Sequence, residues 1–228
     1  MNYAFEPPAT VTVPVADTGT HFPVNRVYCV GRNYREHARE MGASLREPPF
    51  FFSKPADALC SHEEIPYPGM TGKLQHEVEL VVALQSGGSE LSVDDARSAI
   101  FGYAVGVDLT RRDLQAEAKK SGRPWVTAKS FDHSAPISPI RPVGESGHPG
   151  QADIQLAVNG EPRQQGNIAD MTWAVPEVLA ELSRYFELKP GDLVFTGTPA
   201  GVGDLHPGDR VQCDIEKVGS LRFVICPV

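Results

Sequence analysis

An apolar stretch from Leu74 to Leu84 carries two acidic residues, Glu77 and Glu79, in its middle. The stretch is rich in β-branched residues and is followed by a pair of glycines, so we expect it to form a buried strand. Side chains alternate between the two faces of a strand, which predicts that these glutamates share one face with Cα atoms about 6.6 Å apart. A second apolar stretch, 101–107, predicts a strand that ends at Asp108. Three carboxylates are therefore expected to lie on two apolar strands.

The rest of the chain shows many short strand patterns and few helical ones. Asn159-Gly160 is the signal of a two-residue hairpin turn, and Ser92 with Asp95 has the spacing of a helix capping box. Further predicted strands are 26–30, 50–53, 125–129, 153–158, 161–165, 193–196 and 210–216, and the predicted helices are 34–41, 92–99, 109–120 and 177–188. Because strands dominate, we expect an α+β, β-dominated fold. Residues 1–25 are dotted with proline and predict an extended N-terminal arm, and residues 26–228 predict a single domain.

The three expected carboxylates indicate a metal site. Like charges on one face raise a carboxylate pKa and cost folding free energy unless a cation lies between them. No set of Cys or His ligands lies nearby in the sequence, so oxygen ligands favour Mg²⁺, Mn²⁺ or Ca²⁺ over zinc. The alternative is that Glu77 and Glu79 form the solvent face of a half-buried strand.

Other polar residues lie at the ends of the predicted elements. His37 and Glu40 would face the same way on the predicted helix 34–41, where the carboxylate could orient the imidazole as a general base. The alternative is a solvated helix face. Arg111 and Arg112 both stand within one turn of Asp108, and either could hold a substrate carboxylate. The spacing does not choose between them. Lys129 ends the predicted strand 125–129 and is expected beside an anionic group.

Two segments allow either a binding or a purely structural interpretation. Glycines in the segment 196–203 allow close approach of the backbone to a ligand, although a tight connecting loop is the alternative. No Gly-Lys-Ser/Thr sequence follows, so the segment is not a phosphate-binding P-loop. The three phenylalanines at 50–52 are expected in the core, and the following Lys54 is either a solvated strand end or a cation near a substrate.

Composition limits the classes of function. The chain has 228 residues, 41% hydrophobic and 22% charged, which suits one globular domain. Its formal net charge of −8 argues against a nucleic-acid binder. The four cysteines form no CxxC pair and are expected to be reduced, as in a cytoplasmic protein. We also expect no signal peptide and no segment that spans a membrane.

Seven motifs together resemble the fumarylacetoacetate hydrolase family, over a span from about Val27 to the C-terminus. In chain order they are Gly31-Arg32-Asn33-Tyr34, His37-x-x-Glu40, Phe52-Ser53-Lys54-Pro55, His76-Glu77-Val78-Glu79-Leu80, Asp108-Leu109-Thr110-x-Arg112-Asp113, Ala128-Lys129-Ser130-Phe131 and Thr196-Gly197-Thr198-Pro199-x-Gly201-Val202-Gly203. Within the family, the chain is most similar to the short acylpyruvate and fumarylpyruvate hydrolases. The resemblance implies a mixed β-sandwich roll, a homodimer, and metal-dependent hydrolytic cleavage of a carbon–carbon bond in a 2,4-diketo acid such as fumarylpyruvate.

The resemblance also implies roles for individual residues. It makes Glu77, Glu79 and Asp108 the ligands of Mg²⁺ or a similar ion, and it makes His37, Glu40 and Lys129 catalytic, the first two on a mobile lid. The substrate contacts that it implies are Arg32, Lys54, Arg112, Gln115 and Thr198. Within the same fold the alternatives are an oxaloacetate decarboxylase, an acylpyruvase, and an isomerase or tautomerase of a related diacid. A metal-dependent binding module without catalysis is the alternative from another class.

Overall fold

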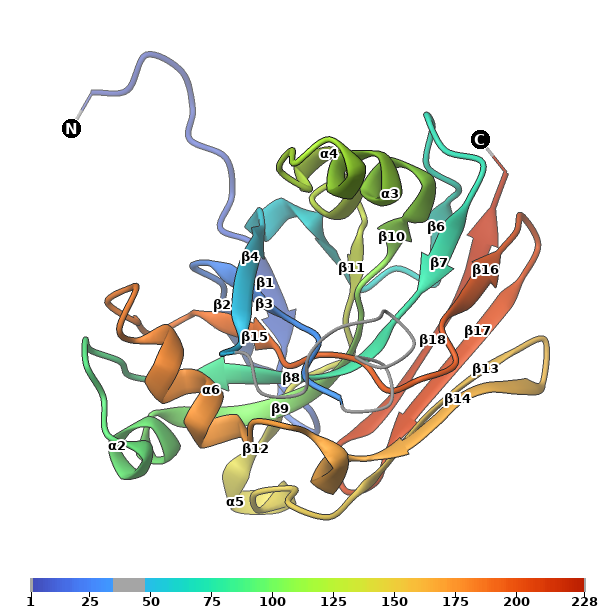
Figure 1. Cartoon of the computed structure of the whole chain (residues 1–228). Helices are drawn as coiled ribbons and strands as arrows, with labels where there is room; N and C mark the ends of the chain where they lie inside the picture. The colour runs from blue at the N-terminus through green and yellow to red at the C-terminus, as the bar shows by residue number, and fades with distance from the viewer. Residues whose placement is uncertain (1, 35–47, 228) are drawn as a thin grey trace.

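The computed structural model describes residues 2–34 and 48–227, and most of its strands gather into two facing sheets (Figure 1). The strands are β1 (Thr12–Pro14), β2 (His21–Pro23), β3 (Val27–Gly31), β4 (Phe50–Lys54), β5 (Leu59–Cys60), β6 (Glu64–Pro66), β7 (Leu74–His76), β8 (Val78–Leu84), β9 (Ile100–Val107), β10 (Thr110–Arg111), β11 (Ala135–Pro136), β12 (Arg141–Pro142), β13 (Asp153–Val158), β14 (Glu161–Asn167), β15 (Leu193–Phe195), β16 (Gly203–Leu205), β17 (Arg210–Ile215) and β18 (Gly219–Cys226). The helices are α2 (Val93–Ser98), α3 (Arg112–Lys120), α4 (Val126–Lys129), α5 (Val143–Ser146) and α6 (Val175–Leu182), with 3₁₀ turns at Ala56–Ala58 and Ile168–Asp170. The expected β-dominated α+β fold is confirmed.

Strand β8 lies inside a six-stranded sheet of order β12-β9-β8-β15-β3-β4. It pairs antiparallel with β9 and β15, and β15 pairs parallel with β3. All seven residues of β8 are buried, because both faces of this sheet are covered. Leu80 and Val82 belong to one hydrophobic cluster, whereas Val81 and Ala83 belong to a second cluster on the opposite face.

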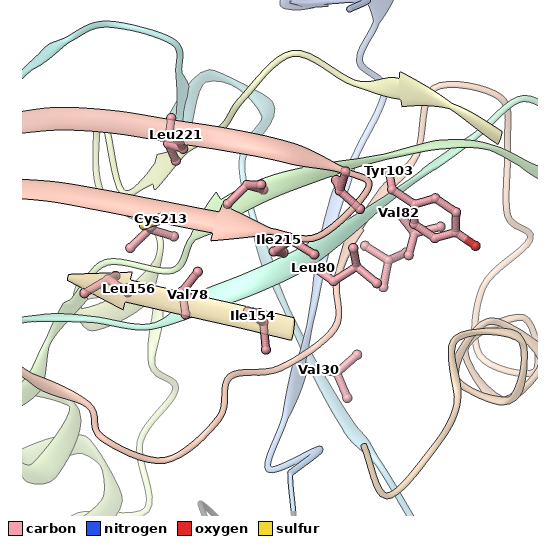
Figure 2. Close-up of a cluster of buried hydrophobic side chains, with 14 of the residues drawn as sticks. Val30, Val78, Leu80, Val82, Tyr103, Ile154, Leu156, Cys213, Ile215 and Leu221 are labelled. Carbon is pink, nitrogen blue, oxygen red and sulfur yellow. The ribbon is translucent and has the colours of Figure 1, made fainter. Parts of the chain in front are cut away.

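A five-stranded sheet of order β14-β13-β17-β18-β6 covers one face of the first sheet. Figure 2 shows side chains of both sheets meeting in this core, and the labelled ones are Val30, Val78, Leu80, Val82, Tyr103, Ile154, Leu156, Cys213, Ile215 and Leu221. The hairpin β1–β2 contributes Val13 and Phe22 to the cluster on the other face. The arrangement is a mixed β-sandwich in which the paired ends of β8 and β9 lie side by side.

The predicted strand through the two glutamates is interrupted at Glu77. β7 pairs with β10 and β16 in a small separate sheet, while β8 pairs within the six-stranded sheet. Glu77 lies between the two strands, and its carbonyl oxygen accepts a hydrogen bond of 2.8 Å from the Asp108 N–H. The single-strand prediction is therefore wrong, because the chain changes its pairing partners at this residue.

Several local predictions are confirmed. The 159–160 turn joins β13 to β14 with positive φ angles of 55° and 85°, as the predicted hairpin requires. Ser92 caps α2, and its hydroxyl accepts a hydrogen bond of 3.1 Å from the Asp95 N–H. All four cysteines are free thiols. In the part of the chain described here, no helix is long and apolar enough to cross a membrane.

Three predicted elements differ from the structure. The segment 125–129 is not a strand but the short helix α4, whose first turn closes when the Ala128 and Lys129 N–H groups donate to the Trp125 carbonyl oxygen. Helix α3 begins at Arg112 rather than at 109, because β10 pairs with β7 first. Helix α6 ends at Leu182, six residues before the predicted end. The predicted helix 34–41 falls outside the described residues after position 34.

Candidate active site

The carboxylates of Glu77, Glu79 and Asp108 converge at one end of the six-stranded sheet. Each offers one oxygen, and these three oxygens lie within 4.8 Å of one another. All three residues are at most 5% exposed. Glu77 comes from the junction of β7 and β8, Glu79 from β8, and Asp108 from the end of β9, so the strand pairing of β8 with β9 brings them together.

Three cations surround the carboxylates. Lys129 Nζ lies 2.6 Å from Glu77 Oε2 and 2.7 Å from Asp108 Oδ2. Lys54 Nζ lies 2.9 Å from Asp108 Oδ1 and donates to Ser134 Oγ at 3.0 Å. The Arg112 guanidinium pairs with Glu77 Oε1. Both lysines are 2% exposed, so these charges interact in a region from which most water is excluded.

Glu79 is the carboxylate without a cationic partner within the residues that the structure describes. Its Oε2 accepts a hydrogen bond of 2.7 Å from the Gly197 N–H. Burial, together with repulsion from Asp108 and Glu77, raises its pKa well above the usual range, against the smaller effect of that hydrogen bond. For Lys129, burial alone would lower the pKa, but attraction to Asp108 and Glu77 outweighs it and raises the pKa.

This set of oxygens fits a hard divalent cation. Asp108 Oδ1 is buried and receives no hydrogen bond of acceptable geometry, despite its contact with Lys54. A cation beside Glu79 would offset the burial and the repulsion that raise its pKa. Carboxylate oxygens without sulfur or imidazole suit Mg²⁺, Mn²⁺ or Ca²⁺.

A pocket opens above the carboxylates and is bounded by helix α3 and an aromatic wall. Arg112, Gln115 and Lys119 line it from one face of α3, since they are spaced three and four residues apart. The aromatic wall is formed by Phe50, Phe52 and Trp125, with the Phe50 and Trp125 ring centroids 5.3 Å apart in an edge-to-face arrangement. The sequence predicts that the phenylalanines of β4 lie in the core rather than at a ligand site. Phe51 and Phe52 do pack against the buried clusters, but Phe50 and Phe52 also line the pocket.

The glycine-containing segment 196–203 brings Thr198 into the pocket. The Gln164 amide holds this residue, because its Nε2 donates to Thr198 Oγ1 at 2.8 Å and to the Pro199 carbonyl oxygen at 2.9 Å. Gln164 Oε1 accepts from the Val78 N–H at 3.1 Å, so both ends of the amide have fixed roles. The Thr198 hydroxyl accepts from Gln164 and therefore keeps its own proton to donate into the pocket.

His76 is the other partner of Gln164. Its Nδ1 lies 2.8 Å from Gln164 Oε1, which can only accept, so Nδ1 carries a proton. Burial lowers the pKa of His76, more than the hydrogen bond raises it. The neutral imidazole thus supports Gln164 from behind the pocket.

Most candidate residues from the sequence meet in this pocket. Its lining includes Arg32, Glu77, Glu79, Asp108, Arg112, Gln115, Lys129 and Thr198. Lys54 lies behind Asp108 rather than on the lining. Arg112 reaches the carboxylates, whereas Arg111 donates to the Thr127 carbonyl oxygen and stacks on Phe131. His37 and Glu40 lie outside the described residues.

Besides Phe50 and Phe52, three residues of the site are not predicted by the sequence. Lys119 could have been found from its helical spacing to Arg112 and Gln115. The strand predicted over 125–129 conceals the position of Trp125 at the start of α4. Gln164 is the buried residue of a mostly exposed polar strand, and the hydrophobic pattern gives no signal for it.

Several known proteins are similar to this chain in sequence or in structure. The family model described as fumarylacetoacetate (FAA) hydrolase C-terminal matches residues 26–226. A crystal structure of fumarylpyruvate hydrolase from Pseudomonas aeruginosa, in complex with Mn²⁺ and pyruvate, is 48% identical and has a TM-score of 0.97, with 100% of each chain covered. Oxaloacetate tautomerase YcgM from Escherichia coli (strain K12) is 45% identical over 192 residues, which cover 83% of this chain and 88% of that protein. The mitochondrial oxaloacetate tautomerase FAHD1 of Mus musculus is 38% identical over 200 residues, 87% of this chain and 90% of that protein.

Proposed function

Because the chain belongs to the fumarylacetoacetate hydrolase family, we propose that it is a metal-dependent hydrolase that cleaves fumarylpyruvate to fumarate and pyruvate. One observation carries the proposal: a buried cluster of three carboxylates, two of which Lys129 bridges, forms the floor of a pocket that Arg112 and Thr198 also line. The 48% identity to a fumarylpyruvate hydrolase whose structure holds Mn²⁺ and pyruvate supports this substrate.

Glu77, Glu79 and Asp108 would hold a divalent cation, with Mg²⁺ or Mn²⁺ as the proposed ion. When bound, such an ion supplies Lewis-acid polarisation of substrate oxygens. The chain itself places the Lys129 ammonium beside the same carboxylates, where it would stabilise the negative charge of a pyruvate enolate. The Thr198 hydroxyl would donate its proton to an anionic oxygen of the substrate.

In the proposed reaction, water attacks the C4 carbonyl carbon of the diketo acid, and the C3–C4 bond then breaks. Its electron pair passes to C3 as the enolate of pyruvate, and the former C4 carbonyl becomes the carboxylate of fumarate. We assign to His37, oriented by Glu40, the removal of a proton from the attacking water, and this proton returns to C3. One water molecule is consumed: one of its protons goes to C3, and the other is released when the new carboxylic acid ionises to the carboxylate of fumarate. No oxidant or reductant is required.

Oxaloacetate tautomerisation is the second candidate, favoured by the 45% identity to the Escherichia coli tautomerase. This reaction moves one proton between C3 and the C2 oxygen of oxaloacetate. It uses the same enolate stabilisation by Lys129 but needs no attacking water. The two functions therefore share the carboxylate cluster and differ in whether a water molecule enters the bond-breaking step.

A spectroscopic assay tests the two functions. Purified protein with Mg²⁺ is given fumarylpyruvate, and loss of the enol absorbance is followed while fumarate and pyruvate are quantified; parallel samples contain EDTA or oxaloacetate. We expect the enol absorbance to fall, fumarate and pyruvate to form in equal amounts, and EDTA to abolish the reaction. Interconversion of oxaloacetate tautomers without fumarylpyruvate cleavage would instead assign the second function.

The variant H37A tests the role of His37. It should retain metal binding and slow hydrolysis about 10²-fold or more, and normal turnover of H37A would refute the assignment of His37 as the base.

A homodimer is also proposed. Strand β4 is the edge of the six-stranded sheet, and a cleft beside it is lined by Phe51, Tyr185 and Phe186. Tyr185 is 63% exposed and Phe186 is 42% exposed, so this apolar surface could bury area against a second copy. Light scattering at micromolar concentration would report twice the chain mass, and a monomer would refute the dimer.

A further inference from the structure

Among the described residues that line the pocket, Lys119 is a cation to which the proposed reaction gives no role. Lys119 lies seven residues after Arg112 on α3, which places its Cα about 10 Å further along the helix axis. Arg112 pairs with Glu77, so the carboxylate cluster lies near the start of this helix face. Lys119 therefore lies about two helical turns further along the pocket lining than Arg112.

Aromatic rings hold the Lys119 side chain in place. Its Nζ lies 5.2 Å from the Trp125 ring centroid, and Trp125 in turn contacts Phe50. The Arg32 guanidinium carbon lies 5.5 Å from the Phe50 ring centroid on the same wall. Lys119 and Arg32 thus both approach rings of the aromatic wall, which provides a flat apolar surface beside their charges.

Lys119 is also distinguished by its pairing. Lys54, Lys129 and Arg112 each contact a carboxylate directly. By contrast, no ion pair joins Lys119 to a carboxylate within residues 2–34 and 48–227. Burial, with repulsion from Arg112 and Arg32, lowers the pKa of Lys119 to about 8. An anion bound beside Lys119 would relieve this repulsion and replace its lost hydration.

The separation of about 10 Å along α3 between Arg112 and Lys119 suits a substrate with a carboxylate at each end. Six carbon–carbon bonds of about 1.5 Å separate the terminal carbons of fumarylpyruvate, so an extended molecule spans roughly 7 to 8 Å. With the pyruvoyl end at the carboxylate cluster and the molecule extended along α3, the far carboxylate would reach towards the last turn of this helix, where the Lys119 side chain could meet it. We propose that Lys119 binds the far carboxylate of the substrate and makes the enzyme selective for dicarboxylic diketo acids over monocarboxylic acylpyruvates. This inference rests on the proposed function.

The test compares fumarylpyruvate with acetylpyruvate, a diketo acid that lacks the far carboxylate. K119M removes the charge and keeps the length of the side chain, and K120M is the matched control, because Lys120 is an exposed neighbour on the same helix. The measured quantity is the ratio of kcat/KM for fumarylpyruvate to kcat/KM for acetylpyruvate. We expect K119M to lower this ratio roughly tenfold to hundredfold, mainly through the KM for fumarylpyruvate, as for loss of one charge-assisted hydrogen bond. K119R should restore part of it, and K120M should leave it within about twofold of the wild type.

The inference would be refuted if K119M left the ratio unchanged, whether kcat/KM fell equally for both substrates or for neither. Calorimetric titration of the Mn²⁺-loaded protein with the same two compounds separates this outcome from failure of the proposed function. A wild type that binds both compounds but cleaves neither would refute the hydrolase function, and the ratio of their dissociation constants in K119M would still decide the role of Lys119. If neither compound binds, both proposals are refuted.

Discussion

Replacing Lys54 with methionine removes the cation behind the carboxylate cluster and leaves the pocket lining intact. The Lys54 ammonium contacts Asp108 Oδ1 at 2.9 Å and Ser134 Oγ at 3.0 Å, and it also donates to the Lys129 carbonyl oxygen. Methionine has a similar length and keeps the apolar stem packed, so K54M deletes the charge and its hydrogen bonds with little change in volume.

The expected loss of stability follows from burial. Removing one partner of a buried ion pair costs about 3 to 5 kcal/mol, because the other charge remains buried. Asp108 keeps its contact of 2.7 Å with Lys129, so the lower end, about 3 kcal/mol, applies. For a chain of this size, each kcal/mol shifts Tm by about 2 to 4 °C, and K54M should therefore unfold about 6 to 12 °C below the wild type without added metal.

Added Mg²⁺ should reverse part of this loss. In the wild type, the Lys54 charge beside Asp108 opposes the binding of any cation by the same carboxylate. Without that charge, metal binding becomes stronger, and a ligand that binds only the folded state stabilises it according to its affinity. Saturating Mg²⁺ should thus raise the Tm of K54M by more than it raises the Tm of the wild type.

Scanning calorimetry with EDTA and with Mg²⁺ measures both effects, and K120M serves as the control for loss of a lysine charge at an exposed position. A Tm for K54M within about 2 °C of the wild type in EDTA would refute the estimate of the ion-pair contribution. A smaller Mg²⁺ response in K54M than in the wild type would refute the argument that Lys54 and the metal compete for Asp108.

Three further predictions address the glycine segment, the Gln164 amide and Lys119. G201A should lose more than about 1 kcal/mol of unfolding free energy in urea titration, because φ is +94° and an added Cβ would lie 2.1 Å from the Arg163 carbonyl oxygen; unchanged stability would refute this. Q164M should lower kcat, and little further loss should follow from adding T198V, since Gln164 acts through Thr198; additive losses in this double-mutant cycle would contradict that coupling. Burial and two nearby guanidinium groups lower the pKa of Lys119 to about 8, so the cation is present below that pH and is lost above it. The kcat/KM for fumarylpyruvate should therefore fall as pH rises through about 8, and this decrease should be missing in K119M.

The parts of the fold that were predicted correctly depend on local patterns. The 159–160 hairpin and the start of α2 follow from short-range turn and capping chemistry, which acts wherever the chain later packs. The errors concern segments whose conformation is decided by distant partners. The sequence 74–84 has a continuous strand pattern, yet β7 pairs with β16 and β8 pairs with β15, so the break at Glu77 depends on residues more than a hundred positions away.

The residues of the candidate site also divide into those that local sequence patterns predict and those that depend on distant partners. Glu77 and Glu79 could be recognised because two charges in an apolar stretch conflict with the cost of burying charge, and the structure places both beside Asp108. Gln164 carries no such conflict in the sequence, since a glutamine among polar strand residues is unremarkable until its neighbours are known. Its buried amide has a defined function only because Val78 and Thr198 approach it from two other segments. Charge patterns therefore locate the carboxylate cluster, whereas the residues that orient the pocket emerge only from the packing of the two sheets.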